Sequence, residues 1–179
     1  METIAVKQAT LADIHQLHSI GRQTFAETFA ASNTPENMAK YLEDGFSLEK
    51  LTAELTHPGS AFYFAMDGEK VIGYLKLNTG ASQTEPNDDN SIEIERIYVL
   101  REYHGQKAGQ LLYEKALEVA SRPRRDKLQR RIAYIWLGVW EENPRAIRFY
   151  QKNGFVAFGK HVFKLGDDEQ TDVMMWKEL

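Results

Sequence analysis

Residues 91–140 restrict the fold more than any other part of the chain. Apolar spacing predicts a strand over Ser91–Leu100, a helix over Gly109–Ser121 and a second strand over Ile132–Trp140. Two strands joined through one helix lie parallel in the same sheet, because the connection must cross back over that sheet. The segment therefore predicts an α/β fold that contains a parallel crossover.

The remaining predicted elements lie on both sides of this crossover. Thr10 and Asp13 have the spacing of a capping box, which predicts the start of a helix whose apolar face carries Phe25 and Phe29. The dipeptide Asp67–Gly68 predicts a hairpin turn. Further helices are predicted to begin at Pro35, Ser47 and Pro144, and further strands are predicted over Ile4–Gln8, Ala61–Met66, Val71–Asn78, Val156–Leu165 and Thr171–Lys177.

Length and composition predict a single domain over residues 1–179, with 42% hydrophobic and 27% charged residues. The absence of cysteine excludes disulfides and thiolate metal sites. The histidines show no paired ligand spacing except at His15 and His18, which we interpret as surface residues, so no metal site is expected. No apolar run is long enough to span a membrane and no secretory signal is recognisable, so we expect a cytoplasmic protein without a membrane partner.

Charge is unevenly distributed along the chain, whose formal net charge is −4. The stretch Arg122–Arg131 is strongly basic, and the rest of the chain is acidic. We interpret the basic stretch as a solvated loop, with contact to a phosphate as the alternative, and expect no nucleic-acid partner. The acidic remainder favours a cationic small-molecule substrate.

The loop His104–Gly109 is the first candidate binding site. The free amides and the dipole of a helix N-terminus attract anions, and Gly105 and Gly109 let the backbone approach a ligand closely. On its own, this pattern fits a plain tight turn equally well. A later segment places Asn143 as the N-cap of a helix that carries Tyr150, beside the end of the crossover's second strand.

Together, the two segments resemble the GCN5-related N-acetyltransferase (GNAT) superfamily. The matching positions are Glu95, Arg96 and Ile97, followed by Val139, Asn143, Ala146, Ile147, Phe149, Tyr150, Gly154 and Phe155. Nearly the whole chain is similar to the PaiA group of spermidine and spermine acetyltransferases, through Phe25–Phe29, Asn33–Met38, Tyr41–Glu43, Ile94–Tyr98, Trp136–Glu141 and Gly166–Asp172. The resemblance implies an α/β (α+β) GNAT fold. Its central sheet is mixed and mostly antiparallel, with about seven strands, flanking helices and splayed parallel fourth and fifth strands.

The loop departs from the family pattern at two positions. His104 stands where the family has Gln or Arg, and Lys107 stands where it has the first Gly. His104 can still donate a hydrogen bond to a phosphate. If the φ angle of Lys107 is negative, the loop is unaffected and its ammonium adds a phosphate contact; if φ is positive, coenzyme A affinity should fall.

The resemblance also implies the reaction. Acetyl-CoA is the cosubstrate, and a primary amine, expected to be a polyamine, attacks it directly in a ternary complex. Tyr150 is the implied proton donor to the leaving thiolate and Glu95 the implied base, with Glu93 as the alternative. The implied acetyl-CoA-binding residues are Ile97, Tyr98, Val99, His104, Gly105, Gln106, Lys107, Ala108, Gly109, Gln110, Asn143, Ala146 and Tyr150, where amides near residues 97–99 stabilise the oxyanion.

A hypothesis for the amine site places an apolar slot across the splayed strands. Its aromatic candidates are Phe25, Phe29, Tyr41, Phe46, Tyr74 and Trp140, and its acidic candidates are Glu36, Glu43, Asp44 and Glu93. The alternative is that the aromatic residues only fill the core. Two other functions stay open: acetylation of another amine, such as a protein N-terminus, amino acid or drug, and an acyl-CoA-binding regulator without activity. A homodimer is compatible with the sequence.

Overall fold

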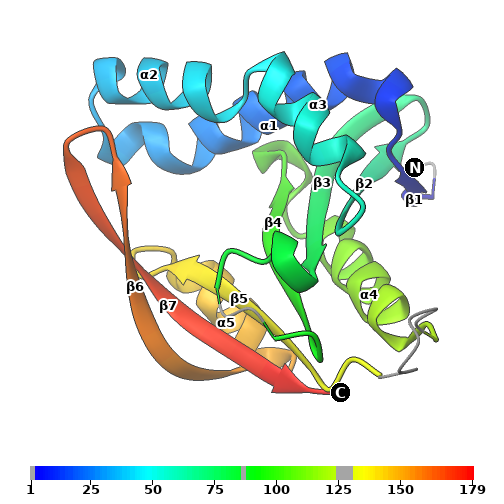
Figure 1. Cartoon of the computed structure of the whole chain (residues 1–179). Coiled ribbons are helices and arrows are strands. Elements are labelled where there is room, and N and C mark those ends of the chain that lie inside the picture. Colours follow the sequence, from blue (N-terminus) through cyan, green and yellow to red (C-terminus); the bar gives the residue numbers. More distant parts are fainter. Residues whose placement is uncertain (1–2, 86–87, 124–130) are drawn as a thin grey trace.

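The computed structural model of the protein describes residues 3–85, 88–123 and 131–179. A seven-stranded sheet runs through them in the order β1-β2-β3-β4-β5-β7-β6 (Figure 1). Neighbouring strands are antiparallel except β4 and β5, which are parallel, so the mixed, mostly antiparallel sheet confirms the predicted fold class. The strands are β1 Ala5–Gln8, β2 Ser60–Asp67, β3 Lys70–Thr79, β4 Ser91–Val99, β5 Tyr134–Trp140, β6 Val156–Leu165 and β7 Asp168–Glu178.

Three of the described helices begin where the sequence predicted their caps. Thr34 and Ser47 each accept a hydrogen bond of 3.2 Å from the backbone amide three residues later, and Asn143 accepts one of 3.1 Å. These bonds satisfy amides that lack a partner inside the helix. Within the described residues the helices are α1 Ile14–Phe29, α2 Pro35–Gly45, α3 Leu48–Thr56, α4 Ala108–Ser121 and α5 Pro144–Lys152.

Two strand boundaries differ from the prediction by more than one residue. β5 begins at Tyr134 rather than Ile132, and β7 begins at Asp168 rather than Thr171. The β6–β7 hairpin is longer than predicted because Leu165 pairs directly with Asp168 across a tight turn. Most of the basic stretch lies outside the described residues, but Arg122 bonds Glu118 one helical turn away.

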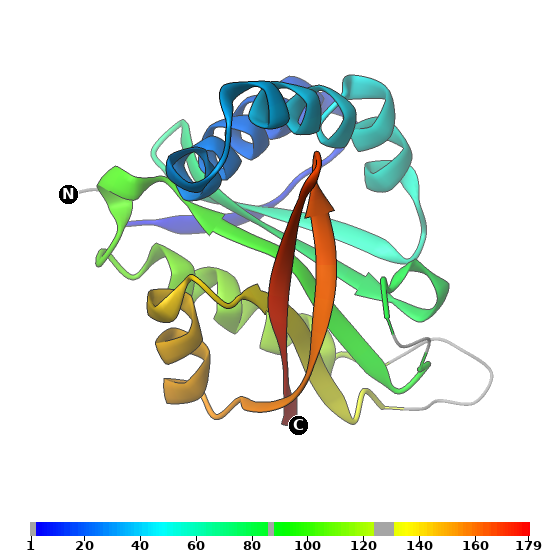
Figure 2. The same ribbon diagram turned by 90° about the vertical axis from the view of Figure 1, so that its left-hand side faces the viewer.

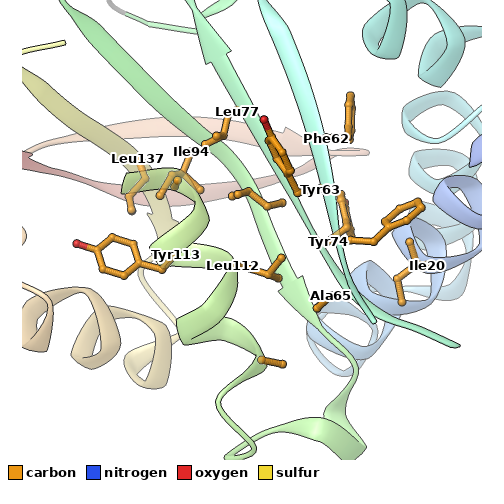
Figure 3. Close-up of a cluster of buried hydrophobic side chains, with 14 of the residues drawn as sticks. Ile20, Phe62, Tyr63, Ala65, Tyr74, Leu77, Ile94, Leu112, Tyr113 and Leu137 are labelled. Atoms are coloured by element: carbon orange, nitrogen blue, oxygen red, sulfur yellow. The ribbon is translucent and has the colours of Figure 1, made fainter. Parts of the chain in front are cut away.

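The helices form one layer on each face of the sheet (Figures 1 and 2). Figure 3 shows Leu112 and Tyr113 of α4 beside one face and Ile20 of α1 beside the other. Each of these three side chains is at most 4% exposed, as expected for positions at helical spacing on an apolar face. Helix α5 packs beside α4 through a ring contact of 6.1 Å between Phe149 and Tyr113.

The parallel pair β4–β5 is joined over only three residues of each strand. Ser91–Glu93 pairs with Tyr134–Trp136, and the two strands separate beyond this point. β4 also contains an irregularity at Glu95, since Lys76 of β3 lies opposite Arg96 while the next residue of β3 lies opposite Ile94. A bulge of this kind breaks the regular alternation predicted for Ser91–Leu100, because it inserts an extra residue into the strand.

The β6–β7 hairpin reaches from the edge of the sheet to the helix layer that contains α2. Figures 1 and 2 show its tip beside α2, where Asn37 donates a hydrogen bond of 2.7 Å to Asp167. The hairpin therefore closes one side of the space that opens between the separated strands. Among the described residues, no helix is both long enough and apolar enough to cross a membrane.

Candidate active site

Two adjoining cavities lie where β4 and β5 separate. The larger, of about 790 Å³, lies at the N-terminus of α4 and is called the α4 cavity. The smaller, of about 320 Å³, lies between α1, β4 and the β6–β7 hairpin and is called the aromatic cavity. They meet at residues that line both: Thr28, Ile97, Tyr98, Trp140, Asn143, Ala146 and Tyr150.

The α4 cavity collects the residues that the sequence predicted to bind acetyl-CoA, with one exception. Twelve of the thirteen line it, including Asn143 and Tyr150 from the distant α5 segment. Gln106 does not line it; its side-chain amide instead donates a hydrogen bond of 2.9 Å to the carbonyl of Glu102. The sequence placed Gln106 in the site because it belongs to the loop His104–Gly109, but its side chain turns back on its own loop.

Lys107 is the only non-glycine residue with a positive φ in the part of the chain that the structure describes. Its angles are φ 68° and ψ 0°, immediately before the first residue of α4. A side chain with a Cβ in this left-handed region loses about 1 kcal/mol relative to glycine. Of the two alternatives left open by the sequence, the structure therefore contains the strained one.

His104 uses both ring nitrogens for contacts within the protein. Its Nε2 lies 2.8 Å from the carbonyl oxygen of Val99, and its Nδ1 contacts the guanidinium of Arg145 on α5. A carbonyl only accepts and a guanidinium only donates, so the neutral ring with its proton on Nε2 fits both contacts. Partial burial and the Arg145 charge lower the pKa of His104, which favours this form.

The expected contact of His104 with a phosphate therefore lacks a free donor. Arg145, which the sequence did not single out, lines the α4 cavity beside His104. Nothing local in the sequence marks this pair, because the two residues are 41 positions apart.

Aromatic side chains form much of the second cavity. Phe25 stacks on Tyr41 with ring centres 4.4 Å apart, and Phe29 lies 5.0 Å from Trp140. The substrate candidates Phe29, Tyr41, Glu93 and Trp140 all line this cavity, as do Phe25 and Phe46. These residues both pack against one another and face open space, so the slot and the core interpretations are not exclusive.

Tyr74 and the acidic residues of α2 do not belong to this cavity. Tyr74 is 1% exposed and stacks on Tyr98 inside the sheet layer. Glu43 is exposed and lies outside the lining, as do Glu36 and Asp44. Tyr41 faces inward, and two residues along a helix correspond to a rotation of roughly 200°, so Glu43 faces solvent.

Glu95, the first candidate base, belongs to a buried group of charges. Lys76 of β3 contacts both Glu95 and Glu54 of α3, and Arg96 contacts the same two carboxylates. All four lie on one side of the sheet because the bulge places Glu95 and Arg96 side by side. Burial alone would raise the pKa of Glu95, but the charges of Arg96 and Lys76 outweigh it and lower that pKa.

Glu93, the alternative base, lies in a different environment. It is 2% exposed and accepts hydrogen bonds from the hydroxyl and the amide of Thr84, the latter at 2.8 Å. Asn78 donates to both Glu93 and Glu95, at 3.1 and 2.6 Å. Burial raises the pKa of Glu93, and the hydrogen bonds offset only part of that rise. The two neighbouring carboxylates thus have pKa values shifted in opposite directions.

Tyr150 lies at the junction of the two cavities. It is 6% exposed, and its ring packs against Phe155 with centres 5.5 Å apart. Burial raises the pKa of Tyr150, so its hydroxyl keeps its proton at neutral pH. Its predicted role as a proton donor requires that a substrate group come within reach of the hydroxyl.

Sequence reasoning missed the contribution of the β6–β7 hairpin to the aromatic cavity. His161 and Phe163 of β6 and Asp172 and Met174 of β7 line it. The alternation of each strand puts these pairs on one face, but only the pairing of the hairpin places that face over the cavity. Burial raises the pKa of Asp172 to about 6, and the nearby His161 limits this rise.

This shift predicts that Asp172 destabilises the protein at neutral pH. A carboxyl whose pKa is higher in the folded than in the unfolded protein binds a proton on folding, so stability falls as the pH rises between the two values. We expect Asp172→Asn to raise the free energy of unfolding by about 1–2 kcal/mol at pH 7.5. The gain in stability should shrink below pH 6 and nearly vanish around pH 3.8, which is the ordinary pKa of an aspartate side chain.

Urea unfolding of both proteins across this pH range measures the difference. Glu169→Gln, which removes an exposed carboxylate from the same hairpin, provides the control and should show no comparable gain. An Asp172→Asn variant no more stable than the native protein at pH 7.5 contradicts the assignment of an unfavourable buried charge.

Several known proteins are similar to this chain over most of its length. The model of the acetyltransferase (GNAT) family matches residues 22–155. The uncharacterized N-acetyltransferase in the pepI 3′ region of Lactobacillus delbrueckii subsp. lactis is 42% identical over 180 residues, covering 100% of this chain and 99% of that protein. The spermidine N(1)-acetyltransferase of Thermoplasma acidophilum is 24% identical over 180 residues, covering 98% of each.

A solved structure has the same fold. The PaiA N-acetyltransferase from Thermoplasma acidophilum, crystallised in complex with coenzyme A, matches with a TM-score of 0.76 and 23% identity over 99% of each chain. The extent of the family match and the identity to the Lactobacillus protein lead to one conclusion: the chain belongs to the acetyltransferase (GNAT) family and is an N-acetyltransferase.

Proposed function

We propose that acetyl-CoA binds in the α4 cavity, that a polyamine binds in the aromatic cavity, and that the acetyl group moves between them at their junction. The observation that carries this proposal is that the two cavities share residues at the point where β4 and β5 separate, including Tyr98, Asn143 and Tyr150. Two substrates bound on opposite sides of this junction are held for direct attack without a covalent enzyme intermediate.

The groups around the α4 cavity suit acetyl-CoA. The first amides of α4 have no partner within the helix and, with the helix dipole, favour the pyrophosphate. Gly105 has a φ of 81°, and a side chain there would meet nothing within 4 Å, so the loop leaves open space for a ligand. Lys107, Arg145 and Lys152 add positive charge around the cavity. When bound, acetyl-CoA supplies the activated acetyl thioester.

The edge of β4 beyond Glu93 suits the pantetheine part of the same ligand. Residues 97–99 line the α4 cavity and have no strand pairing toward β5. Apart from the Val99 carbonyl, which His104 contacts, the backbone groups that point away from β3 are available for a ligand, as buried backbone donors and acceptors need partners. The amides near Ile97–Val99 are the proposed donors to the carbonyl oxygen of the acetyl group.

An amine reacts only after losing a proton, which a carboxylate of β4 is proposed to accept. A base works best when its pKa approaches the working pH. Glu95 has a lowered pKa and is held by Lys76 and Arg96, whereas burial raises the pKa of Glu93. This difference favours Glu93 over the first candidate Glu95. Tyr150, which retains its proton, is the proposed donor to the leaving thiolate.

A polyamine suits the aromatic cavity in shape and charge. Aromatic walls such as Phe29 and Trp140 accommodate methylene groups and attract cations, and the carboxylates lining the cavity compensate ammonium groups. The similarity to a spermidine acetyltransferase supports the same substrate class. Another amine remains the second candidate, and an acyl-CoA-binding regulator the third, although Glu93 in the aromatic cavity and Tyr150 at the junction favour a catalyst.

A substrate panel tests the proposal. With acetyl-CoA, we expect kcat/KM for spermidine and spermine to exceed that for lysine peptides, amino acids and aminoglycosides by at least about tenfold, which corresponds to 1.4 kcal/mol of differential binding. Mass spectrometry of the product identifies the acetylated nitrogen. Efficient turnover of another amine alone contradicts the polyamine assignment, and calorimetric binding of acetyl-CoA without any product favours the regulator.

Substitution of Tyr150 tests the proposed proton donor. Tyr150→Phe keeps the ring and its packing on Phe155 but removes the hydroxyl. General acid catalysis contributes typically 10²–10⁴-fold, so we expect kcat to fall by about 10²-fold while acetyl-CoA affinity, measured by calorimetry, changes little. An unchanged kcat excludes Tyr150 from proton transfer, and Phe155→Leu controls for altered packing alone.

A pair of variants at Lys107 tests the strained loop. Lys107→Ala and Lys107→Gly both remove the ammonium, but only glycine adopts a positive φ without strain. We expect the glycine variant to be about 1 kcal/mol more stable to urea than the alanine variant and to bind acetyl-CoA at least as tightly. Equal stabilities contradict a positive φ at this position. If both variants bind acetyl-CoA more weakly than the native protein, the difference measures the contribution of the Lys107 ammonium.

A further inference from the structure

Three carboxylates line the aromatic cavity, and they differ in how their charge is compensated. Glu93 accepts hydrogen bonds from Thr84 and Asn78, and Glu95 contacts Lys76 and Arg96. Asp172 forms no ion pair or side-chain hydrogen bond with another described residue, and its electrostatic neighbours are His161 and Tyr41. A half-buried carboxylate without a partner is unfavourable unless a ligand supplies the missing charge.

The sheet register fixes the direction in which Asp172 points. It lies opposite Trp140 on β5 and opposite His161 on β6. Directly paired residues share a face of the sheet, and all three line the aromatic cavity. Asp172 therefore lies in the middle of a row across three strands, with the Trp140 ring on one side.

Gly138 of β5 provides the space for this carboxylate. A Cβ added at Gly138 would lie 3.1 Å from Oδ2 of Asp172 and 3.4 Å from the sulfur of Met174. Any larger residue would force the Asp172 side chain to move. The cavity wall at this point thus consists of bare backbone with a carboxylate above it.

The positive groups that line the cavity do not neutralise Asp172. Arg96 is engaged with Glu54 and Glu95, and His161 lies 3.3 Å from Glu85. Lys50, on α3, also lines the cavity, but no ion pair between it and Asp172 is found among the described residues. A cation that enters the cavity is therefore the group that best compensates this charge.

Asp172 lies beside the junction and not within it, because its neighbour Trp140 lines both cavities. Asp172 itself lines the aromatic cavity alone, whereas Tyr98 and Tyr150 line both cavities. A charge on the substrate near Asp172 thus belongs to a nitrogen other than the one that is acetylated at the junction. A monoamine has no such second charge, but a diamine or polyamine does.

We propose that Asp172 binds the second, non-reacting ammonium group of a diamine or polyamine, an inference that rests on the proposed function. Asp172 thereby selects such substrates over monoamines. The rings of Trp140, Phe29 and Phe163 complete the site, since aromatic faces attract the same cation. Gly138 keeps the carboxylate accessible. Asp172 is therefore a specificity-determining residue for the acetyl transfer.

Kinetics with a matched substrate pair test this assignment. Spermidine and 1,5-diaminopentane carry a further ammonium, and pentylamine has the same methylene chain as the diamine without it. In Asp172→Asn, we expect KM for spermidine and the diamine to rise at least about tenfold with kcat within about twofold, while KM for pentylamine stays unchanged. Glu169→Gln, on the exposed side of the hairpin, should leave all values unchanged.

Calorimetric titration of spermidine into both proteins separates this proposal from the acetyl-transfer proposal. If the native protein acetylates no amine, the transfer proposal fails, but weaker spermidine binding by Asp172→Asn still supports the site. The Asp172 proposal is overturned if both proteins bind spermidine equally and have the same ratio of KM for the diamine to KM for pentylamine. A fall in kcat without a change in KM also overturns it, because Asp172 would then act in the chemistry and not in binding the distant charge.

Gly138→Ala provides a second, independent variant. The added methyl group displaces the Asp172 carboxylate without changing any charge. The same selective rise in KM for the diamine is expected, and a uniform rise for diamine and monoamine contradicts the proposal.

Discussion

The early end of the pairing between β4 and β5 is the constraint on which the rest of the site depends. The two strands share a register only over Ser91–Glu93 and Tyr134–Trp136 and then separate. Each strand leaves unpaired backbone at the gap, which would be unfavourable if nothing occupied it. The α4 cavity lies on one side of this gap and the aromatic cavity on the other, so a single interruption of the sheet creates both sites and their junction.

Buried charges hold the open edge of β4 in place. Glu54 of α3 bridges Lys76 of β3 and Arg96 of β4, and Glu95 contacts the same two cations. Buried charges are tolerated only when paired, so removing one partner would leave the others uncompensated. The group therefore couples the helical layer to the strand that separates, and it fixes the bulge that brings Glu95 and Arg96 to one side.

The sequence predicts local features of this fold well and contacts between distant segments poorly. Caps such as Asn143 and the strand–helix–strand segment follow from short-range patterns, and both were confirmed. The bulge at Glu95 was missed because it depends on the register with β3. Asp172 was missed because its position over the cavity depends on the hairpin pairing, and the contact between His104 and Arg145 depends on how α5 packs near the loop.

Three features that break ordinary local rules face the two cavities. Lys107 has a backbone conformation that favours glycine, and Asp172 is a half-buried carboxylate without a partner. The indole nitrogen of Trp140, at the junction, is buried without a hydrogen bond among the described residues. Such features lower stability and persist where the surrounding structure enforces them. All three therefore lie where the proposed ligands would bind: Lys107 beside the acetyl-CoA cavity, Asp172 in the amine cavity and Trp140 between them.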